Sequence, residues 1–247
     1  MQVFQAELFK NKNNSGLIIF LLFPALTTLL ILGAFVYRSN ELETGINYWS
    51  KIGEFLFLFY WFYPVIIALA VFSIFYIEDK NYGYKQLFTL PVRRPKIYIA
   101  KWGLLILYTL MSVMVAYSSF LLGGHLLDIF FHLGMNEYPV FSIINLYFLR
   151  IFLFSLAVLS FQHFFSLLFK HLVLSLGIAV FMNVSSIILS SVQWKYLWTI
   201  PYAGFRTASI QFWMEDTLFW QKDIMVALIC FILFAFIGQF IFINKKG

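Results

Sequence analysis

The sequence predicts an all-α membrane protein with six transmembrane helices in a single domain that covers residues 1–247. The first observation is composition, because 62% of the residues are hydrophobic and only 11% are charged. Soluble domains average about 45–50% apolar and about 25% charged residues. The second observation is a mean hydropathy of +0.86, which also excludes a disordered chain. The third observation is a set of long apolar stretches, each of which is a candidate span.

The apolar stretches are long enough to cross about 30 Å of hydrocarbon as helices. They show no alternation of apolar and polar residues, so the helical solution is favoured over a closed barrel. The first stretch is longer than the apolar part of a signal peptide, and we expect the mature protein to retain it. The predicted spans are residues 16–37, 55–77, 102–124, 149–169, 172–191 and 224–243.

The distribution of charge predicts the orientation. With the N-terminus inside, eleven of the 17 Lys and Arg residues and only three of the 11 Asp and Glu residues lie on the inner side. The positive-inside rule then places both termini in the cytoplasm. Arg150 falls at the outer end of the fourth span, where we expect its long side chain to reach the interface. The inner basic residues are Lys10, Lys12, Lys80, Lys85, Arg93, Arg94, Lys96, Lys101, Lys170, Lys245 and Lys246.

The interiors of the predicted spans contain no Asp, Glu, Lys or Arg. Proton-coupled transporters keep an ionisable group there, so coupled secondary transport is disfavoured. His163 is the one histidine in a predicted span, and a lone histidine is more typical of hydrogen-bonded packing than of a proton relay. The single Cys230 excludes a disulfide framework and a cysteine metal cluster. No G-x-x-x-x-G-K-[ST], H-E-x-x-H or G-x-S-x-G motif occurs, so we expect no cofactor in this chain.

One group of residues suggests an alternative, a membrane enzyme. His125, Asp128 and His132 share a face if the third helix continues through them, and His and Asp are ligands for zinc or iron. The simpler interpretation is two interfacial histidines and an acid at the outer end of the third span. A further alternative is a channel or scaffold subunit that works without ATP.

The largest inner loop, about residues 78–101, is the most informative segment. Tyr84, Leu87 and Phe88 share one face of a short helix that Pro91 would end. Pro95 is expected to prevent a quick return into the membrane. A short amphipathic helix at this position suits a groove on a soluble partner, and a solvated loop is the alternative. A basic cluster follows and is expected at headgroup depth, namely Arg93, Arg94, Lys96 and Lys101.

The loop resembles the membrane subunits of type-2 ABC exporters. The similarity consists of an acid at the end of span 2, a glycine about five residues later, L-x-x-L-P-x-x-R, and a lysine that opens span 3. Within that class, KQLFTLPVRRPKIYIAK is most similar to permeases of lantibiotic-immunity and related antimicrobial-peptide exporters. The residues that carry the resemblance are Glu78, Gly83, Leu87, Leu90, Pro91, Arg94 and Lys101.

The resemblance implies a permease subunit of the bacterial cell membrane that expels antimicrobial peptides or similar hydrophobic compounds. It implies that residues 82–90 form a coupling helix that docks, with its flanks, into a separate dimer of ATP-binding subunits. ATP and magnesium would be bound by that partner, and nucleic acid would have no role. The docking residues would be Glu78, Gly83, Tyr84, Leu87, Phe88, Leu90, Pro91, Arg93, Arg94 and Lys101.

The resemblance also implies three features of the architecture. Residues 1–14 would form an in-plane amphipathic helix, and Met1, Phe4 and Leu8 do form an apolar stripe. Helices would dip into the membrane from outside between spans 5 and 6, where three Trp and two Tyr residues are clustered. A second permease, either the same chain or a related one, would complete the transport pathway.

Overall fold

The fold was analysed in a computed structural model, which describes residues 2–37, 49, 57–80, 93–132, 141–169, 171–214 and 221–244. These residues are helical or lie in short turns and caps. The helices are α1 (Gln2–Asn11), α2 (Ser15–Tyr37), α4 (Phe57–Lys80), α6 (Arg94–Phe131), α7 (Phe141–Leu168), α8 (Leu172–Ser191), η3 (Leu197–Thr199), η4 (Pro201–Ala203), α9 (Gly204–Trp213) and α10 (Lys222–Asn244).

Five helices among the described residues are long and apolar enough to cross a membrane, namely α2, α6, α7, most of α8, and α10. The apolar stretch recognised within α4 is shorter, Trp61–Tyr76. Many apolar side chains face outward, and on α2 Leu22, Leu26 and Leu29 are 55–65% exposed. A surface of this kind is compatible with lipid and not with water. The chain is therefore a multi-pass helical membrane protein.

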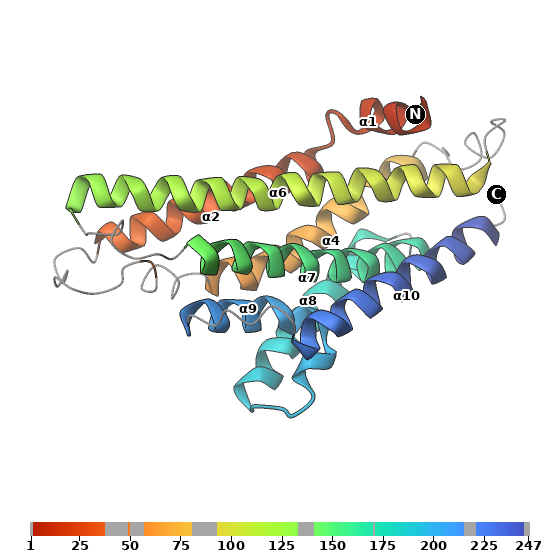
Figure 1. Cartoon of the computed structure of the whole chain (residues 1–247). Helices are drawn as coiled ribbons and strands as arrows, with labels where there is room; N and C mark the ends of the chain where they lie inside the picture. Colours follow the sequence, from red (N-terminus) through yellow and green to blue (C-terminus); the bar gives the residue numbers. More distant parts are fainter. Residues whose placement is uncertain are drawn as a thin grey trace.

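Helix α7 lies at the centre of the bundle. It packs against α10 on one side and α4 on the other, and α9 also contacts it. In the most apolar 18-residue stretch of α7, 61% of the residues are buried, whereas in the corresponding stretch of α10 only 17% are buried. Helix α2 packs against α6 and α4, and α8 packs against α4, while the turn after α8 projects from the rest of the molecule (Figure 1). The core is therefore built around α7 and α4.

The helix bounds change the interpretation of two charged residues. Helix α6 extends beyond the predicted span 102–124 at both ends, and α7 begins before the predicted start at 149. Arg150 lies in the third turn of α7 and is only 1% exposed, so it is not an outer-end side chain at the interface. Lys101 is also completely buried. The interiors of the predicted spans still contain no charged residue, but α6 and α7 each bury one just outside or at the end of a predicted span, because the helices continue past the apolar runs.

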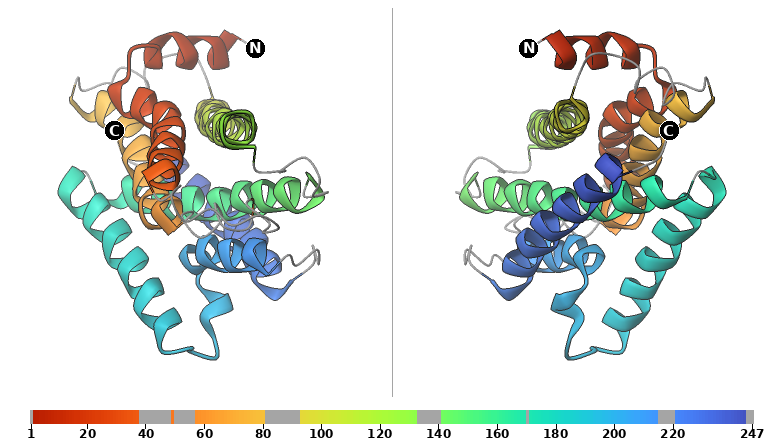
Figure 2. Two further views of the ribbon diagram at one scale, coloured as in Figure 1. Left: turned by 90° about the vertical axis from the view of Figure 1, so that its left-hand side faces the viewer. Right: turned by 90° about the vertical axis from the view of Figure 1, so that its right-hand side faces the viewer.

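Both ends of the chain lie at the end of the molecule where α6 begins (Figure 1). Figure 2 looks along α6 and shows that α1 lies across the direction of α6 rather than parallel to it. Helix α1 packs on α6, where the ring of Phe4 lies beside Gly103. This end of the molecule also contains the end of α4 and the start of α6, which flank residues 81–92.

The segment after α8 packs back into the bundle. One face of α9 is buried through Phe205, Ala208 and Phe212. Helix α9 begins at Gly204, where a Cβ atom would overlap the buried ring of Phe154 in α7. The absence of a side chain at Gly204 is therefore what allows α9 to lie against the central helix.

Replacing Gly204 with alanine should destabilise the protein by about 1–3 kcal/mol, because the new methyl group displaces a buried ring in a packed core. Gly177 in α8 is the matched control, since its added Cβ would meet no atom within 4 Å. The measurement is the thermal unfolding midpoint of each purified variant in the same detergent. Equal midpoints for Gly204→Ala and Gly177→Ala would contradict this packing.

Candidate functional site

The candidate site is the end of the molecule that holds the end of α4 and the start of α6, the two helices that precede and follow residues 81–92 in the sequence. The predicted docking residues Gly83, Tyr84, Leu87, Phe88, Leu90 and Pro91 lie outside the described residues. Glu78 lies in the last turn of α4, and its side chain is not described. Arg93, Arg94 and Lys101 are described, and each has a different role in the start of α6.

Helix α6 begins directly at Arg94. Arg93 is its N-cap in an extended conformation, and Pro95 occupies the first turn. Proline is well tolerated there because the first-turn N–H groups have no partner within the helix and its fixed φ suits a helix. Pro95 therefore belongs to the helix that continues into the third predicted span. The expectation that it prevents a quick return into the membrane stays a prediction.

The first two turns of α6 are hydrogen bonded to α10. Arg94 donates from Nη1 to the carbonyl oxygen of Ile243 at 2.7 Å, and the Tyr98 hydroxyl donates to the carbonyl oxygen of Ala235 at 2.7 Å. The Ile243 carbonyl belongs to the last turn of α10, where carbonyl groups lack helical partners and a cation is favourable. Gly238 leaves room for Tyr98, since a Cβ there would lie 2.8 Å from the hydroxyl.

Lys101 forms a buried ion pair with α1. Its Nζ lies 3.2 and 3.3 Å from the two carboxylate oxygens of Glu7. Lys101 is 0% exposed and Glu7 5% exposed, so the lysine is covered by protein and its charge does not face the surroundings of the molecule. Water solvates neither charge well at this depth, and each therefore depends on the other.

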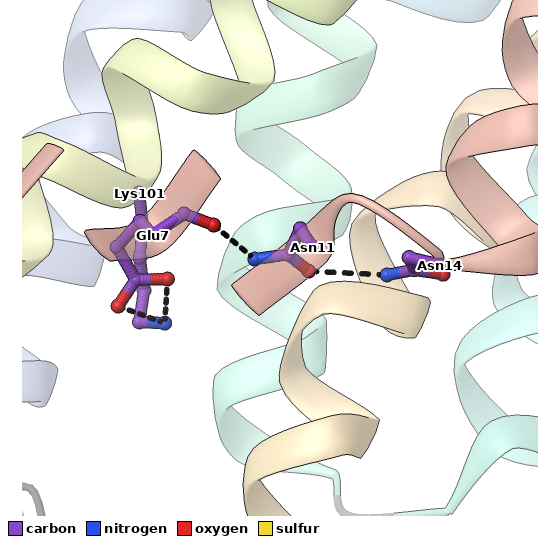
Figure 3. A network of polar contacts seen from close by, with 4 residues as sticks. All are labelled: Glu7, Asn11, Asn14 and Lys101. Carbon is purple, nitrogen blue, oxygen red and sulfur yellow. Dashed lines mark hydrogen bonds and ion pairs between the residues drawn. The ribbon is translucent and has the colours of Figure 1, made fainter. Parts of the chain in front are cut away.

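The ion pair continues as a chain of polar contacts, shown in Figure 3. Asn11 donates to the Glu7 carbonyl oxygen at 3.0 Å, and Asn14 donates to the Asn11 side-chain oxygen at 3.2 Å. The side-chain oxygen of Asn14 accepts a hydrogen bond from the backbone N–H of Gly16, and Asn14 therefore caps the start of α2. We call Glu7, Asn11, Asn14 and Lys101 the N-terminal brace. It connects α6, α1 and α2 at the end of the molecule where α6 begins.

His163 lies behind the brace and is completely buried. Its ring packs against Phe75, Tyr98 and Trp102, with centroid distances of 4.8, 5.2 and 4.9 Å. Neither ring nitrogen has a hydrogen-bond partner among the described residues, so the expected hydrogen bond is not found. The aromatic surroundings do agree with a packing role.

The possible metal site at the other end of α6 is not formed. His132 is the C-cap of α6 with a left-handed backbone (φ 52°), so it leaves the helical face shared by His125 and Asp128. His125 is half-buried and its ring packs edge-on to Trp49 at 6.0 Å. Within the described ranges, no group of three His, Cys, Asp or Glu side chains could hold a metal ion.

Several polar side chains within the helices connect one helix to another. The Tyr63 hydroxyl donates to Ser112 at 3.1 Å, and Ser112 donates to the Phe20 carbonyl oxygen at 2.9 Å. Asn183 of α8 donates to the Trp61 carbonyl oxygen of α4 at 2.6 Å. These bonds join α2, α4, α6 and α8 as interhelical polar contacts do in membranes.

A second polar cluster fixes the segment between α8 and α10. Gln162 of α7 donates to the Tyr202 hydroxyl, whose pKa is raised by burial. Arg206 donates to the Ile187 carbonyl oxygen at 3.2 Å, and Thr207 donates to the Asp223 carboxylate at 3.0 Å. The sequence alone does not reveal these partners, because they come from five separate helices, α7, α8, η4, α9 and α10.

These features define a multi-pass helical membrane protein in which polar contacts connect α1, α2 and the start of α6 at one end. The chain matches the model of a family described as ABC-2 family transporter protein over residues 3–186. It belongs to this family. No curated protein and no solved structure gave a significant match.

Family membership makes the chain a membrane-spanning permease subunit of an ABC transporter, as the loop motif predicted. Permeases of this family typically pair with an ABC ATP-binding subunit. The match includes α1, the brace and most of α8, while η3, η4, α9 and α10 follow it. The narrower resemblance to lantibiotic-immunity permeases stays a prediction.

Breaking the brace should destabilise the protein strongly. Lys101→Met leaves the Glu7 carboxylate buried without its cation, which costs about 3–5 kcal/mol. The double variant Glu7→Gln with Lys101→Met should recover much of this loss, because no buried charge remains. Thermal unfolding in detergent measures both effects.

Lys96→Met is the control for the loss of a lysine, since Lys96 is exposed in the first turn of α6. It should unfold at the wild-type temperature. If Lys101→Met does so too, the buried ion pair has no structural role.

Proposed function

We propose that this permease is half of the membrane pathway of an ATP-driven exporter, which expels antimicrobial peptides such as lantibiotics and bacteriocins or similar hydrophobic compounds. It resides in the bacterial cell membrane with both termini in the cytoplasm. Residues 82–90 are its coupling helix, which docks into a dimer of ATP-binding subunits. ATP and magnesium bind to those subunits, and a second permease, identical or related, completes the pathway.

The observation that carries the proposal is that the start of α6, which follows residues 81–92 in the sequence, is connected to α1 and α10. The segment is bounded by α4 and by the rigid start of α6, and α6 is joined to α10 through Arg94 and to α1 through Lys101. A displacement of the docked segment would therefore move three helices together as a rigid body. Motions of this kind are how nucleotide-driven transitions open and close domains.

The proposed topology has six crossings. The apolar stretch within α4 is too short to cross the membrane by itself. The whole helix is long enough, because its 24 residues extend about 36 Å. The ends of α1 and α10 lie at one end of the molecule (Figure 1), which agrees with an even number of crossings. In this topology α1 lies in the plane of the inner surface, and η3, η4 and α9 dip into the membrane from outside.

Two features support a hydrophobic cargo. Trp194, Tyr196 and Trp198 are 39–50% exposed at the turn after α8, as expected for aromatic residues at a membrane interface. These residues also lie after residue 186, where the match to the family ends. We expect a segment outside the shared part of the family to be the one that is adapted to a particular cargo. The alternative metal enzyme loses its support because His132 leaves the helix face. A channel or scaffold subunit differs in showing no ATP-dependent transport.

Docking is tested by co-purification. Tagged protein extracted from native membrane in mild detergent should carry an ATP-binding subunit that mass spectrometry identifies. Leu87→Asp should reduce the recovered subunit by about tenfold or more, because it places a charge in the apolar face of the docked helix. It should also abolish resistance to the cargo while membrane insertion stays normal.

Val192→Asp is the matched control for Leu87→Asp. It adds the same charge at an exposed residue in the turn after α8. Normal recovery of the ATP-binding subunit by Leu87→Asp would refute the docking role. Transport that persists under a proton gradient after nucleotide depletion would refute the whole proposal.

Topology is tested by cysteine labelling in a Cys230→Ser background. A membrane-impermeant maleimide should label Val192→Cys in intact cells, because that turn faces outward in the proposed topology. The same reagent should label Lys96→Cys only after the membrane is permeabilised. The reverse pattern would invert the proposed orientation.

A further inference from the structure

A groove of about 340 Å³ opens between α1 and α6, away from the brace. Its lining comes from one side of α1 and the following turn, together with one tyrosine of α6. The residues are Gln5, Leu8, Phe9, Lys12 and Tyr108. None of them has a role in docking or in the brace, so the groove is a separate feature.

The register of α1 explains why the groove exists. Gln5, Leu8, Phe9 and Lys12 follow the i, i+3, i+4, i+7 pattern and therefore share one face. Glu7 and Asn11 lie on the other, buried face and form the brace. The groove face includes Phe9, which is 78% exposed. The brace therefore holds α1 in an orientation that leaves an apolar side chain and a lysine beside the groove.

The charge of the groove is positive. Lys12 is exposed, and among the described residues no carboxylate lines the groove. The one acid within α1 is Glu7, whose carboxylate is buried against Lys101. The groove therefore complements an anion, and the Gln5 amide and Tyr108 hydroxyl add neutral hydrogen-bonding groups.

The groove changes from polar to apolar along its length. Lys12 lies three residues before Ser15, where α2 begins, so it is near the membrane surface in the topology proposed above. Tyr108 lies about 21 Å along α6 from Arg94 and so reaches toward the hydrocarbon. Leu8 and Phe9 lie between them on α1, which lies across α6 (Figure 2). An anionic lipid has the same arrangement, because its charged headgroup would lie at the cationic end of the groove and its acyl chain at the apolar end.

We propose that this groove binds an anionic phospholipid of the inner leaflet. The phosphate lies at Lys12 and Gln5, and the first part of an acyl chain contacts Leu8, Phe9 and Tyr108. Such binding would hold α1, and with it the brace, at the membrane surface. This proposal rests on one part of the proposed function, namely that α2 and α6 cross the bilayer. It does not depend on the identity of the cargo.

Native mass spectrometry of the purified permease tests the proposal. The probes are phosphatidylglycerol and phosphatidylcholine with identical acyl chains, added at the same concentration. Wild-type protein should retain phosphatidylglycerol in preference to phosphatidylcholine. Lys12→Gln should weaken phosphatidylglycerol binding about fivefold, the effect of one lysine near an anionic surface. Lys96→Gln removes an exposed lysine outside the groove and should leave binding unchanged.

Two further arms test the acyl contact. Phe9→Ser should weaken the binding of both lipids, because this side chain meets the chain and not the headgroup. Glycerol phosphate, the water-soluble part of the lipid, should fail to displace phosphatidylglycerol. Displacement by glycerol phosphate would identify a free-phosphate site and overturn the proposal.

The proposal is also overturned if Lys12→Gln and Lys96→Gln bind phosphatidylglycerol equally, or if the two lipids bind wild-type protein equally. Displacement of the lipid by an exported compound without any effect of Lys12→Gln would make the groove a cargo site instead. The ATP-binding subunit should still co-purify with Lys12→Gln, so a failure of this proposal is distinguishable from a failure of docking.

Discussion

The ion pair between Lys101 and Glu7 is the interaction on which the braced end of the molecule depends. Burying a charged lysine or a charged glutamate without a partner would strongly destabilise the fold. The attraction between the two charges offsets much of this desolvation cost when they are buried as a pair. Their pairing fixes where α1 crosses α6, and Asn11 and Asn14 extend the connection to the first turn of α2. The chain thereby joins its first helix to the third long helix at the place where an ATP-binding partner is proposed to act.

Elsewhere the protein is held by packing and by short polar contacts. The hydrophobic effect offers little between helices in lipid, so close packing and interhelical hydrogen bonds supply the attraction. Tyr63 illustrates both, because its ring stacks on Phe59 at 4.4 Å and its hydroxyl contacts Ser112. Among the described residues, aromatic rings enclose the imidazole of His163 without giving it the polar partners that a proton relay requires.

The two faces of α1 explain how one short helix can serve two purposes. Glu7 and Asn11 attach the helix to the bundle, while Leu8 and Phe9 stay at the edge of a groove with Lys12. The attachment needs a fixed rotation of the helix, and that rotation decides which side chains remain outside. The connection to α6 and the proposed lipid contact are therefore set by the same ion pair.

The sequence by itself determined the class of protein, because apolar length and the scarcity of charge leave helices in lipid as the only solution. It also determined the permease family through the local spacing of the loop motif, which the family match supports. The tertiary structure decided the partners of Lys101, Arg94, Tyr202 and Arg206, since these lie far apart along the chain or on separate elements. It also decided that Pro95 begins a helix and that His132 leaves one, because hydropathy does not report backbone geometry.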